Sequence, residues 1–195
     1  MKTIVLASNN EHKLKELKEM IKGYKILTLK DINFNEEIEE TGTTFKENAL
    51  IKAKTIHDYL KEKGLNYMVV SDDSGLCVDA LNGEPGVYSA RYSGNHDFQA
   101  NRDKIRKELV GKKRDAHFMC TIALYYPNGI YEIFEGRTDG QIIDEERGKT
   151  DFGYDCIFYS NDLNKTFGEA TEEEKNSVSH RSRATQKLME YLSEE

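Results

Sequence analysis

Tyr67-Met68-Val69-Val70-Ser71-Asp72-Asp73-Ser74-Gly75 is the stretch that decides how the rest of this sequence is interpreted. The apolar run predicts a buried strand over residues 67–71, and it places Asp72 and Asp73 at the carboxyl end of that strand. In open α/β sheets, ligands sit beyond the carboxyl ends of the strands. Two adjacent carboxylates in that position predict a metal-dependent site at the edge of a sheet. An ordinary exposed turn, in which Asp, Ser and Gly are common, is the alternative.

Hydrophobic periodicity on both sides of this stretch predicts alternating strands and helices. Toward the N-terminus, the pattern predicts strands over 3–7 and 25–28, a helix over 13–22, and a long helix from residue 45 to about 62 that starts with a capping box at Thr44 and Glu47. Toward the C-terminus, it predicts a short extended piece over 75–80, a loop over 83–97 and a helix over 98–109. A hairpin of 116–126 and 130–136 follows, and then strands over 141–143 and 156–159. A second capping box at Thr171 and Glu174 precedes a predicted helix over 180–192. Early βα units followed by a hairpin favour an α/β fold with a mixed sheet flanked by helices.

The composition indicates a globular protein with one domain over residues 1–195. Hydrophobic residues make up 37% of the chain, which is enough for a core at this length. The net charge of −7 argues against a broad nucleic-acid surface. It is compatible with a phosphate ligand, because a divalent cation can bridge carboxylates and phosphate oxygens.

Cysteine spacing and hydropathy indicate a soluble cytoplasmic protein without a membrane segment. Cys77, Cys120 and Cys156 form no CxxC pair and no zinc pattern, so they are expected to be buried and reduced. The apolar run at residues 4–7 is too short for a signal peptide. No run approaches the ~20 apolar residues of a membrane span.

Two further segments could supply charged groups to the site. Glu40 ends an acidic loop directly ahead of the long predicted helix, where it could complete a cation site with Asp73, although a solvated acidic face is the default interpretation. Ser8-Asn9-Asn10-Glu11-His12-Lys13 joins a predicted strand to a predicted helix. Helix N-termini bind phosphate, and Lys13 would add a positive charge, but an ordinary capped turn explains the same residues.

Aromatic and cationic residues near the C-terminus could bind a nucleoside. In Phe152-Gly153-Tyr154-Asp155, Phe152 or Tyr154 could stack on a base while Gly153 permits close approach of the backbone. Lys175, His180 and Arg181 lie close together toward the C-terminus, and the Lys and Arg donors could face a base carbonyl or a phosphate. A core strand and a charged helix surface are the alternatives. The sequence contains neither a P-loop nor a GxGxxG fingerprint.

Taken in order, these segments resemble the inosine triphosphate pyrophosphatase family, the non-canonical purine NTP pyrophosphatases. The resemblance runs essentially from end to end. Its motifs are Ser8-Asn9-Asn10-Glu11-His12-Lys13, Glu40-Thr41-Gly42 with Phe45 and Glu47-Asn48-Ala49, Ser71-Asp72-Asp73-Ser74-Gly75-Leu76, Pro85-Gly86-Val87-Tyr88-Ser89-Ala90-Arg91-Tyr92-Ser93-Gly94, Phe152-Gly153-Tyr154-Asp155, and Glu174-Lys175 with Ser179-His180-Arg181. Two positions depart from the commonest form of the family. Asn9 stands where Gly is frequent, and Asp151 stands where Gly often precedes Phe152.

The resemblance implies an elongated α/β protein with a mixed central sheet, two lobes and an active-site cleft between them. It implies a homodimer and a Mg²⁺-dependent reaction of a nucleoside triphosphate with water that gives the monophosphate and pyrophosphate. The preferred substrates would be ITP, dITP and XTP, so the enzyme would remove deaminated purines from the nucleotide pool.

The resemblance also implies roles for individual residues. Asp73 would accept the proton and bind Mg²⁺, with Glu40 near the metal. The segment from Ser8 to Lys13 and Ser74 would hold the substrate. The nucleoside end would be lined by Phe152, Gly153, Tyr154, Asp155, Lys175, His180 and Arg181.

Two other functions remain compatible with the residues. One is a related pyrophosphatase that acts on other modified nucleotides, such as pyrimidines. The other is a nucleotide-binding regulator without catalysis. The presence of Asp73, Glu40 and Lys175 argues against the regulator.

Overall fold

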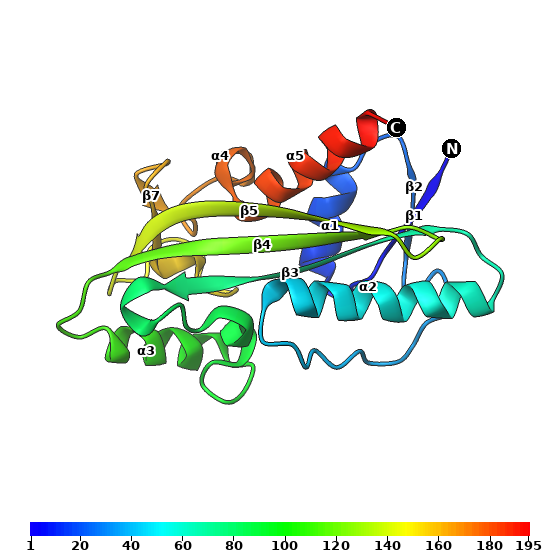
Figure 1. The fold of residues 1–195 in the computed structure, drawn as a ribbon. Helices are drawn as coiled ribbons and strands as arrows, with labels where there is room; N and C mark the ends of the chain where they lie inside the picture. The colour runs from blue at the N-terminus through cyan, green and yellow to red at the C-terminus, as the bar shows by residue number, and fades with distance from the viewer. The chain divides into compact units, whose positions relative to one another are not determined.

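A seven-stranded sheet in the order β2-β1-β3-β4-β5-β6-β7 forms the backbone of the computed structural model, which describes residues 1–195 (Figure 1). The strands are β1 Thr3–Leu6, β2 Lys25–Thr28, β3 Met68–Val78, β4 Asp115–Tyr125, β5 Tyr131–Ile142, β6 Phe158–Ser160 and β7 Lys165–Thr166. β1 pairs in parallel with β2 and β3, whereas β6 pairs antiparallel with β5 and β7. The sheet is therefore mixed, as the sequence predicts.

Five α-helices and three short 3₁₀ helices accompany the sheet. They are α1 Glu11–Met20, α2 Phe45–Glu62, α3 Phe98–Glu108, α4 Glu172–Val178 and α5 His180–Ser193, with 3₁₀ helices at Asp79–Leu81, Gly86–Arg91 and Asp155–Ile157. A mixed sheet flanked by helices confirms the predicted α/β fold class. No helix combines the length and the apolar composition that crossing a membrane requires.

The chain divides into two compact units. Unit 1 comprises Met1–Asp73, Thr121–Glu135 and Ala184–Glu195, and unit 2 comprises Ser74–Cys120 and Gly136–Arg183. The boundaries fall within β3, β4, β5 and α5, so each of these elements contributes residues to both units.

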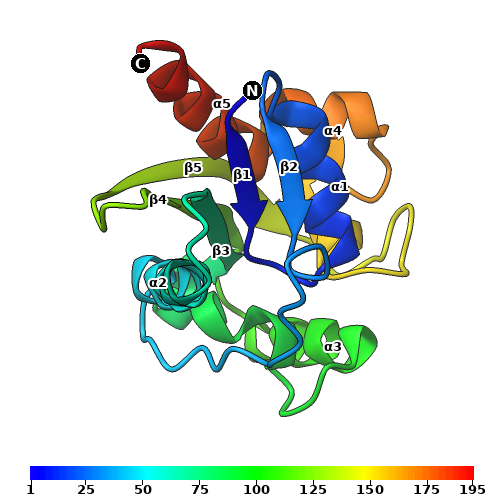
Figure 2. The same cartoon turned by 90° about the vertical axis from the view of Figure 1, so that its right-hand side faces the viewer.

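The core of unit 1 forms where α2 packs on the parallel strands. Side chains alternate along a strand, so Val5 faces α2 and joins a cluster with Ala49 and Ile56, while its neighbours Ile4 and Leu6 face the other way. Figures 1 and 2 show α2 on one side of these strands, with α1 and the C-terminal part of α5 on the other. β1 and β3 are buried on both faces, which explains their apolar runs, whereas the edge strand β2 is exposed or half-buried.

Helix α2 begins and ends where the sequence predicts, but its N-terminal cap differs in one respect. The Thr44 hydroxyl accepts a hydrogen bond from the Glu47 N–H at 3.1 Å, as in a capping box. The Glu47 carboxylate, however, accepts from the N–H of Thr43 at 2.7 Å, so the reciprocal half of the box is displaced by one residue. The second predicted capping box, at Thr171 and Glu174, is complete.

Strand β3 is longer than the sequence predicts, and this corrects the position of the two carboxylates. The strand continues from Met68 to Val78 without a break. Asp72 and Asp73 therefore lie inside it and are only 1% and 6% exposed, so the prediction that they follow the end of a strand was wrong. Polar residues at 72–74 end the apolar periodicity, but Leu76 and the residues after it continue the extended backbone.

The hairpin predicted near residue 128 is present. The N–H of Tyr126 donates to the carbonyl oxygen of Ile130 at 2.8 Å, and this closes the turn between β4 and β5. The strand predicted at 141–143 is the end of β5 rather than a separate element. The strand predicted at 156–159 begins at Phe158, because a 3₁₀ helix occupies Asp155–Ile157.

Aromatic rings from β4, from β6 and from Phe167, the residue after β7, form the core of unit 2. The Phe118 centroid lies 4.5 Å from that of Phe158 and 5.9 Å from that of Phe167. Ile105 and Leu109, from α3 and its C-terminal end, pack into the same cluster. Helix α3 is thereby fixed in unit 2 with its polar side chains free to contact neighbouring loops.

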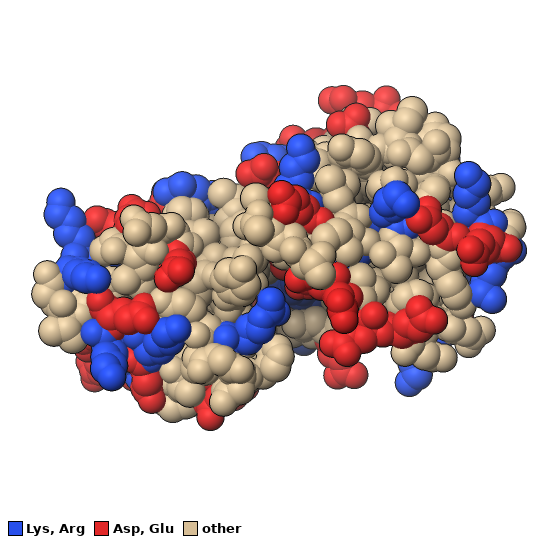
Figure 3. Space-filling view, turned by 60° about the horizontal axis from the view of Figure 1, so that its bottom comes forward, with Lys and Arg blue, Asp and Glu red and all other residues tan.

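The cysteines are buried, as the sequence predicts. Cys77, Cys120 and Cys156 are buried and form no disulfide. Acidic and basic side chains are interspersed over the face drawn in Figure 3.

Candidate active site

Asp73 is held in unit 1 by α2, the helix packed against β3. The Ser71 hydroxyl donates to the carbonyl oxygen of Ala49 at 2.5 Å and ties the strand to the helix. From the neighbouring position on α2, the side-chain amide of Asn48 donates from Nδ2 to Oδ2 of Asp73 at 3.2 Å. Asn48 is 2% exposed, so the bond is shielded from water. Asp73 is thus a buried carboxylate with a fixed orientation.

Lys52, one turn further along α2, joins the acidic loop to the carboxylate strand. Its ammonium lies 2.8 Å from Oε1 of Glu40 and donates to the backbone carbonyl oxygen of Asp72 at 2.5 Å. Burial lowers the pKa of Lys52, but the carboxylates of Asp72, Glu40 and Asp73 outweigh burial and hold it above its ordinary value. Lys52 therefore stays charged among three acidic groups.

The segment from Ser8 to Lys13 connects β1 to α1 and places a second ammonium beside the strand. Asn10 caps α1, because its Oδ1 accepts from the N–H groups of His12 and Lys13 at 3.0 and 3.2 Å. Ser8 in turn accepts the N–H of Asn10 at 3.1 Å. Nζ of Lys13 lies 3.3 Å from Oδ2 of Asp72. The cap occupies two of the N–H groups that could otherwise bind phosphate, so Lys13 is the charged group this segment offers. Asn9 and Glu11 are exposed.

The electrostatic environment of Asp73 suits a proton acceptor. Burial raises the pKa of Asp73 from 3.8 to about 6; Lys52 opposes the rise, Glu40 adds to it, and Lys13 and the Asn48 hydrogen bond also oppose it. A carboxylate with this pKa is mostly ionised at neutral pH and is a stronger base than an exposed aspartate. General bases work best when their pKa lies near the working pH.

The same groups fit a divalent cation that arrives with phosphate. The structure contains no group of three or more His, Cys, Asp or Glu side chains arranged to hold a metal ion. Mg²⁺, however, is usually bound by one or two carboxylates together with substrate phosphates and water. Glu40 raises the pKa of Asp73, so the two negative charges repel each other and a cation near them would relieve that repulsion.

In unit 2, the predicted nucleoside-binding residues fall into exposed and buried groups. Phe152 is 38% exposed, whereas Tyr154 is buried and donates from its hydroxyl to the carbonyl oxygen of Ser89. Phe152 is therefore the ring of this motif that a base can reach. Gly153 between them has a φ of 58°, which favours glycine at this position.

The cationic residues of unit 2 are held by neighbouring polar groups. Nζ of Lys175 on α4 lies 2.7 Å from Oδ2 of Asp155. At the start of α5, Arg181 donates to the hydroxyl of Ser74 at 3.3 Å. The ring of His180 is buried and stacks on Phe118, with 4.8 Å between the centroids. The structure thus joins Lys175 to Asp155 and Arg181 to Ser74, while His180 packs against the core.

Two residues of the site in unit 1 had no role in the sequence-based prediction. Asn48 was only part of a motif, and Lys52 was one lysine among several on α2. The available signal was their spacing: positions 48 and 52 lie four apart and flank the buried Ala49, so they share a boundary of the apolar face. A polar residue at such a boundary can reach a group on the strand that the helix covers.

Comparisons with known proteins show the family to which the chain belongs. The Ham1 family matches residues 4–191. The dITP/XTP pyrophosphatase of Bacillus subtilis (strain 168) is 46% identical over 198 aligned positions, with 98% of each chain covered. That of Clostridium perfringens (strain 13 / Type A) is 44% identical over 199, with 98% of each covered.

Solved structures give the same result. The structure of the Staphylococcus aureus Ham1 protein is 39% identical, has a TM-score of 0.89, and covers 99% of each chain. The structure of a HAM1 protein from Coxiella burnetii is also 39% identical with a TM-score of 0.89, over the full length of both chains. With a family match over nearly all of its length and relatives that align from end to end, this chain belongs to the Ham1 family.

Proposed function

We propose that this chain hydrolyses the non-canonical purine nucleoside triphosphates ITP, dITP and XTP to the monophosphate and pyrophosphate, and so removes deaminated purines from the nucleotide pool. The observation that carries the proposal is the buried carboxylate of Asp73, with its raised pKa, beside Lys52 and Glu40. Relatives from Bacillus subtilis and Clostridium perfringens that bear the name dITP/XTP pyrophosphatase support the substrate class.

In the proposed reaction, a water molecule attacks a phosphorus atom of the triphosphate and Asp73 accepts its proton. The new bond joins the water oxygen to phosphorus, and pyrophosphate leaves with the electron pair of the broken P–O bond. Lys13 and Lys52 bring positive charge to the phosphate oxygens. Phosphoryl transfer depends mainly on such positioning and charge neutralisation.

The proposed cofactor is Mg²⁺, held by Glu40 and Asp73 together with the phosphates. When bound, it would supply further neutralisation of charge on the phosphate oxygens. Asn48 keeps Asp73 oriented, and Lys52 keeps Glu40 close to the strand. The reaction needs these carboxylates ionised, which the surrounding ammonium groups favour.

We propose that the residues of unit 2 bind the nucleoside. The exposed ring of Phe152 would stack on the base, while Lys175 and Arg181 would donate hydrogen bonds to it or to a phosphate. Ser74 would hold the substrate beside Arg181, and His180 would support this end from the core. Gly153 and Tyr154 would shape the backbone next to Phe152. Asp155 would orient Lys175 through their ion pair.

We propose that residues 1–195 form one catalytic domain built from two compact units, which acts as a homodimer in the cytoplasm. The end-to-end family match supports a single functional domain. Three buried cysteines without a disulfide suit a reducing compartment. The active-site cleft between two lobes stays a prediction.

The test is an assay of the purified protein with ITP and MgCl₂, in which pyrophosphate and orthophosphate are measured separately. Release of IMP and pyrophosphate is expected, and Asp73→Asn should lower kcat by roughly 10²–10⁴ while the protein stays folded. ITP binding without turnover would favour the regulator. Faster turnover of modified pyrimidine nucleotides would favour the related pyrophosphatase, and a folded Asp73→Asn variant with more than about a tenth of kcat would exclude the assigned base.

A further inference from the structure

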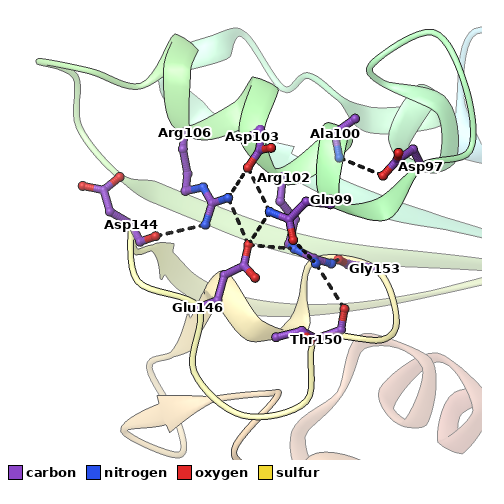
Figure 4. Close-up of polar contacts among 10 residues, drawn as sticks. All are labelled: Asp97, Gln99, Ala100, Arg102, Asp103, Arg106, Asp144, Glu146, Thr150 and Gly153. Carbon is purple, nitrogen blue, oxygen red and sulfur yellow. Dashed lines mark hydrogen bonds and ion pairs between the residues drawn. The ribbon is translucent and has the colours of Figure 1, made fainter.

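Arg102 on α3 is a buried arginine whose contacts lead to one loop. The residue is 2% exposed and makes four hydrogen bonds (Figure 4). Nη1 donates to the carbonyl oxygen of Gly153 at 2.7 Å, and Nη2 donates to that of Thr150 at 3.1 Å. Nε donates to Oε2 of Glu146 at 3.3 Å, and Nη2 also donates to Oε1 of Gln99 at 3.1 Å.

This pattern connects the helix to the loop at three points. Three of the four acceptors belong to residues 144–153, which we call the anchored loop. The planar guanidinium can reach several acceptors at once, whereas an ammonium has no fixed fork. Burying a guanidinium is costly unless its N–H groups have hydrogen-bond acceptors. Moving the anchored loop would leave these buried donors unpaired, and removing Arg102 would free the loop backbone.

Neighbouring side chains of α3 strengthen the same connection. The Glu146 carboxylate also accepts from Nε2 of Gln99 at 2.8 Å and lies 3.0 Å from Nη2 of Arg106. Arg106 donates in turn to the backbone carbonyl oxygen of Asp144 at 3.0 Å. Figure 4 shows these groups converging on Glu146 between the helix and the loop. The anchored loop is therefore held at Asp144, Glu146, Thr150 and Gly153.

Phe152 lies between the two carbonyl groups that Arg102 holds. Its ring is 38% exposed and meets the ring of Phe98 edge-on, with 5.4 Å between the centroids and an angle of 65°. Phe98 is the first residue of α3, so the helix contacts the loop backbone through Arg102 and the exposed ring through Phe98. An exposed aromatic ring on a fixed backbone can stack on a ligand without first being ordered.

We propose that Arg102 is a positioning residue for base recognition: it holds the carbonyl groups of Thr150 and Gly153 so that Phe152 presents its ring to the purine. The inference rests on the proposed function, in which Phe152 stacks on the base. Arg102 touches neither the base nor the phosphates and acts through the anchored loop.

The test compares ITP hydrolysis by the wild type, Arg102→Lys and Arg102→Leu. Loss of base stacking is expected to raise KM for ITP roughly ten- to hundredfold, because stacking is a large share of base binding. kcat should stay within about threefold, since Asp73 and the lysines of unit 1 are unchanged. KM does not depend on the fraction of active protein, so it remains interpretable if a variant is less stable.

A second measurement separates binding from chemistry. Calorimetric titration of ITP into each variant in an Asp73→Asn background, with MgCl₂ present, should show the same ten- to hundredfold weaker binding. Glu146→Gln is a milder variant that keeps Arg102 and weakens its partner, and it should raise KM in the same direction by less. It keeps the inference testable if neither Arg102 variant folds.

Arg114→Lys is the matched control. Arg114 pairs with the carboxylate of Asp144 at 2.9 Å, so it contacts the anchored loop at the opposite end from Phe152, through an exposed side chain. KM and kcat should stay at wild-type values. A similar rise in KM for this variant would mean that any disturbance of the loop suffices, and would overturn a specific role for Arg102.

Lower thermal stability with unchanged KM in the Arg102 and Glu146 variants would make the network merely structural and overturn the inference. Loss of kcat at unchanged KM would overturn it as well. Absence of ITP hydrolysis in the wild type would instead refute the proposed function, so the two failures are distinguishable.

Discussion

Asn48 and Asp73 form a buried pair in which the amide Nδ2 of Asn48 donates to Oδ2 of the carboxylate at 3.2 Å. The same amide accepts the N–H of Gly42 through Oδ1 at 2.8 Å. One side chain thus links the proposed base to the loop that carries Glu40. A Cβ at position 42 would lie 2.7 Å from that oxygen, so glycine permits the approach.

Replacing Asn48 should move the pH dependence of activity. The hydrogen bond from Asn48 helps to lower the pKa of Asp73, which burial raises to about 6. In Asn48→Leu, the pKa of Asp73 should rise further, so the acidic limb of kcat/KM for ITP shifts to higher pH by up to about one unit and activity at pH 7 falls about twofold. Thr55→Val, on an outer position of α2, is the control and should keep the wild-type profile. An unshifted limb in a folded Asn48→Leu protein would contradict this role.

Asp73 should also make stability depend on pH. Its pKa is raised from 3.8 to about 6, so the folded state binds the proton more tightly than the unfolded state does. Its contribution therefore favours folding below about pH 4 and is lost as the pH rises to about 6. Metal-free wild type and Asp73→Asn should be compared by urea unfolding from pH 4 to 7. The free energy of unfolding of the variant should gain about 2–3 kcal/mol relative to wild type across that range. A constant difference would mean that Asp73 has an ordinary pKa.

Lys52 and Lys54 offer a matched pair of lysines on α2. Lys52 is buried beside Glu40 and Asp72, whereas Lys54 is exposed and pairs with Asp58 at 2.8 Å. Lys52→Met should cost about 3–5 kcal/mol of stability, because it leaves buried carboxylates without their counter-charge. It should also lower kcat/KM by at least about a hundredfold. Lys54→Met should change stability by no more than about 0.5 kcal/mol and leave turnover unchanged. Equal effects of the two substitutions would argue against a special environment for Lys52.

Local signals in the sequence were sufficient to predict much of the fold. The bounds of α2 were predicted correctly because Thr44 caps it and its apolar residues recur at helical spacing. The mixed sheet followed from βα units and a hairpin turn. β3 was predicted too short, because burial of Asp72 and Asp73 depends on packing by α2, which hydropathy along the strand does not report.

The site was predictable where a motif carried it and missed where only tertiary contact creates it. Asp73, Glu40 and Lys13 were selected from sequence, and the structure brings them together in unit 1 with Lys52. The contacts of Asn48 and Lys52 join residues 25 and 20 positions apart, so no local pattern reveals them. Arg102 likewise has the sequence appearance of an ordinary charge on a helix surface.

The cysteine thiols should be unreactive in the folded protein and unnecessary for activity. Burial raises the pKa of Cys77 to about 11 and also raises that of Cys156, so little thiolate is present at neutral pH. A colorimetric thiol reagent should label the native protein slowly and all three cysteines once urea is added. Single replacements of Cys77, Cys120 and Cys156 by Ala should lower stability but keep kcat in the folded fraction. A well-folded but inactive variant would contradict the purely structural role.

The nucleoside site should discriminate at position 6 of the purine. Lys175 is held by Asp155 at 2.7 Å and Arg181 by Ser74 at 3.3 Å, so both present donors from fixed positions. A 6-oxo group accepts from such donors, whereas the 6-amino group of ATP would leave them unpaired. Sites that depend on a specific hydrogen bond can reject the wrong group by up to about 10⁴–10⁵.

GTP also carries a 6-oxo group, so its rejection needs a second feature, the lack of a suitable place for its 2-amino group. XTP has a 2-oxo group there, which can accept from a donor. We therefore expect kcat/KM for ITP and XTP well above that for GTP, with GTP at or above ATP, all measured at the same MgCl₂ concentration. Replacing Lys175 by Met should bring the kcat/KM values for ITP and ATP closer together, mainly by lowering the value for ITP. Comparable kcat/KM values for ATP and ITP in the wild type would refute recognition through the 6-oxo group.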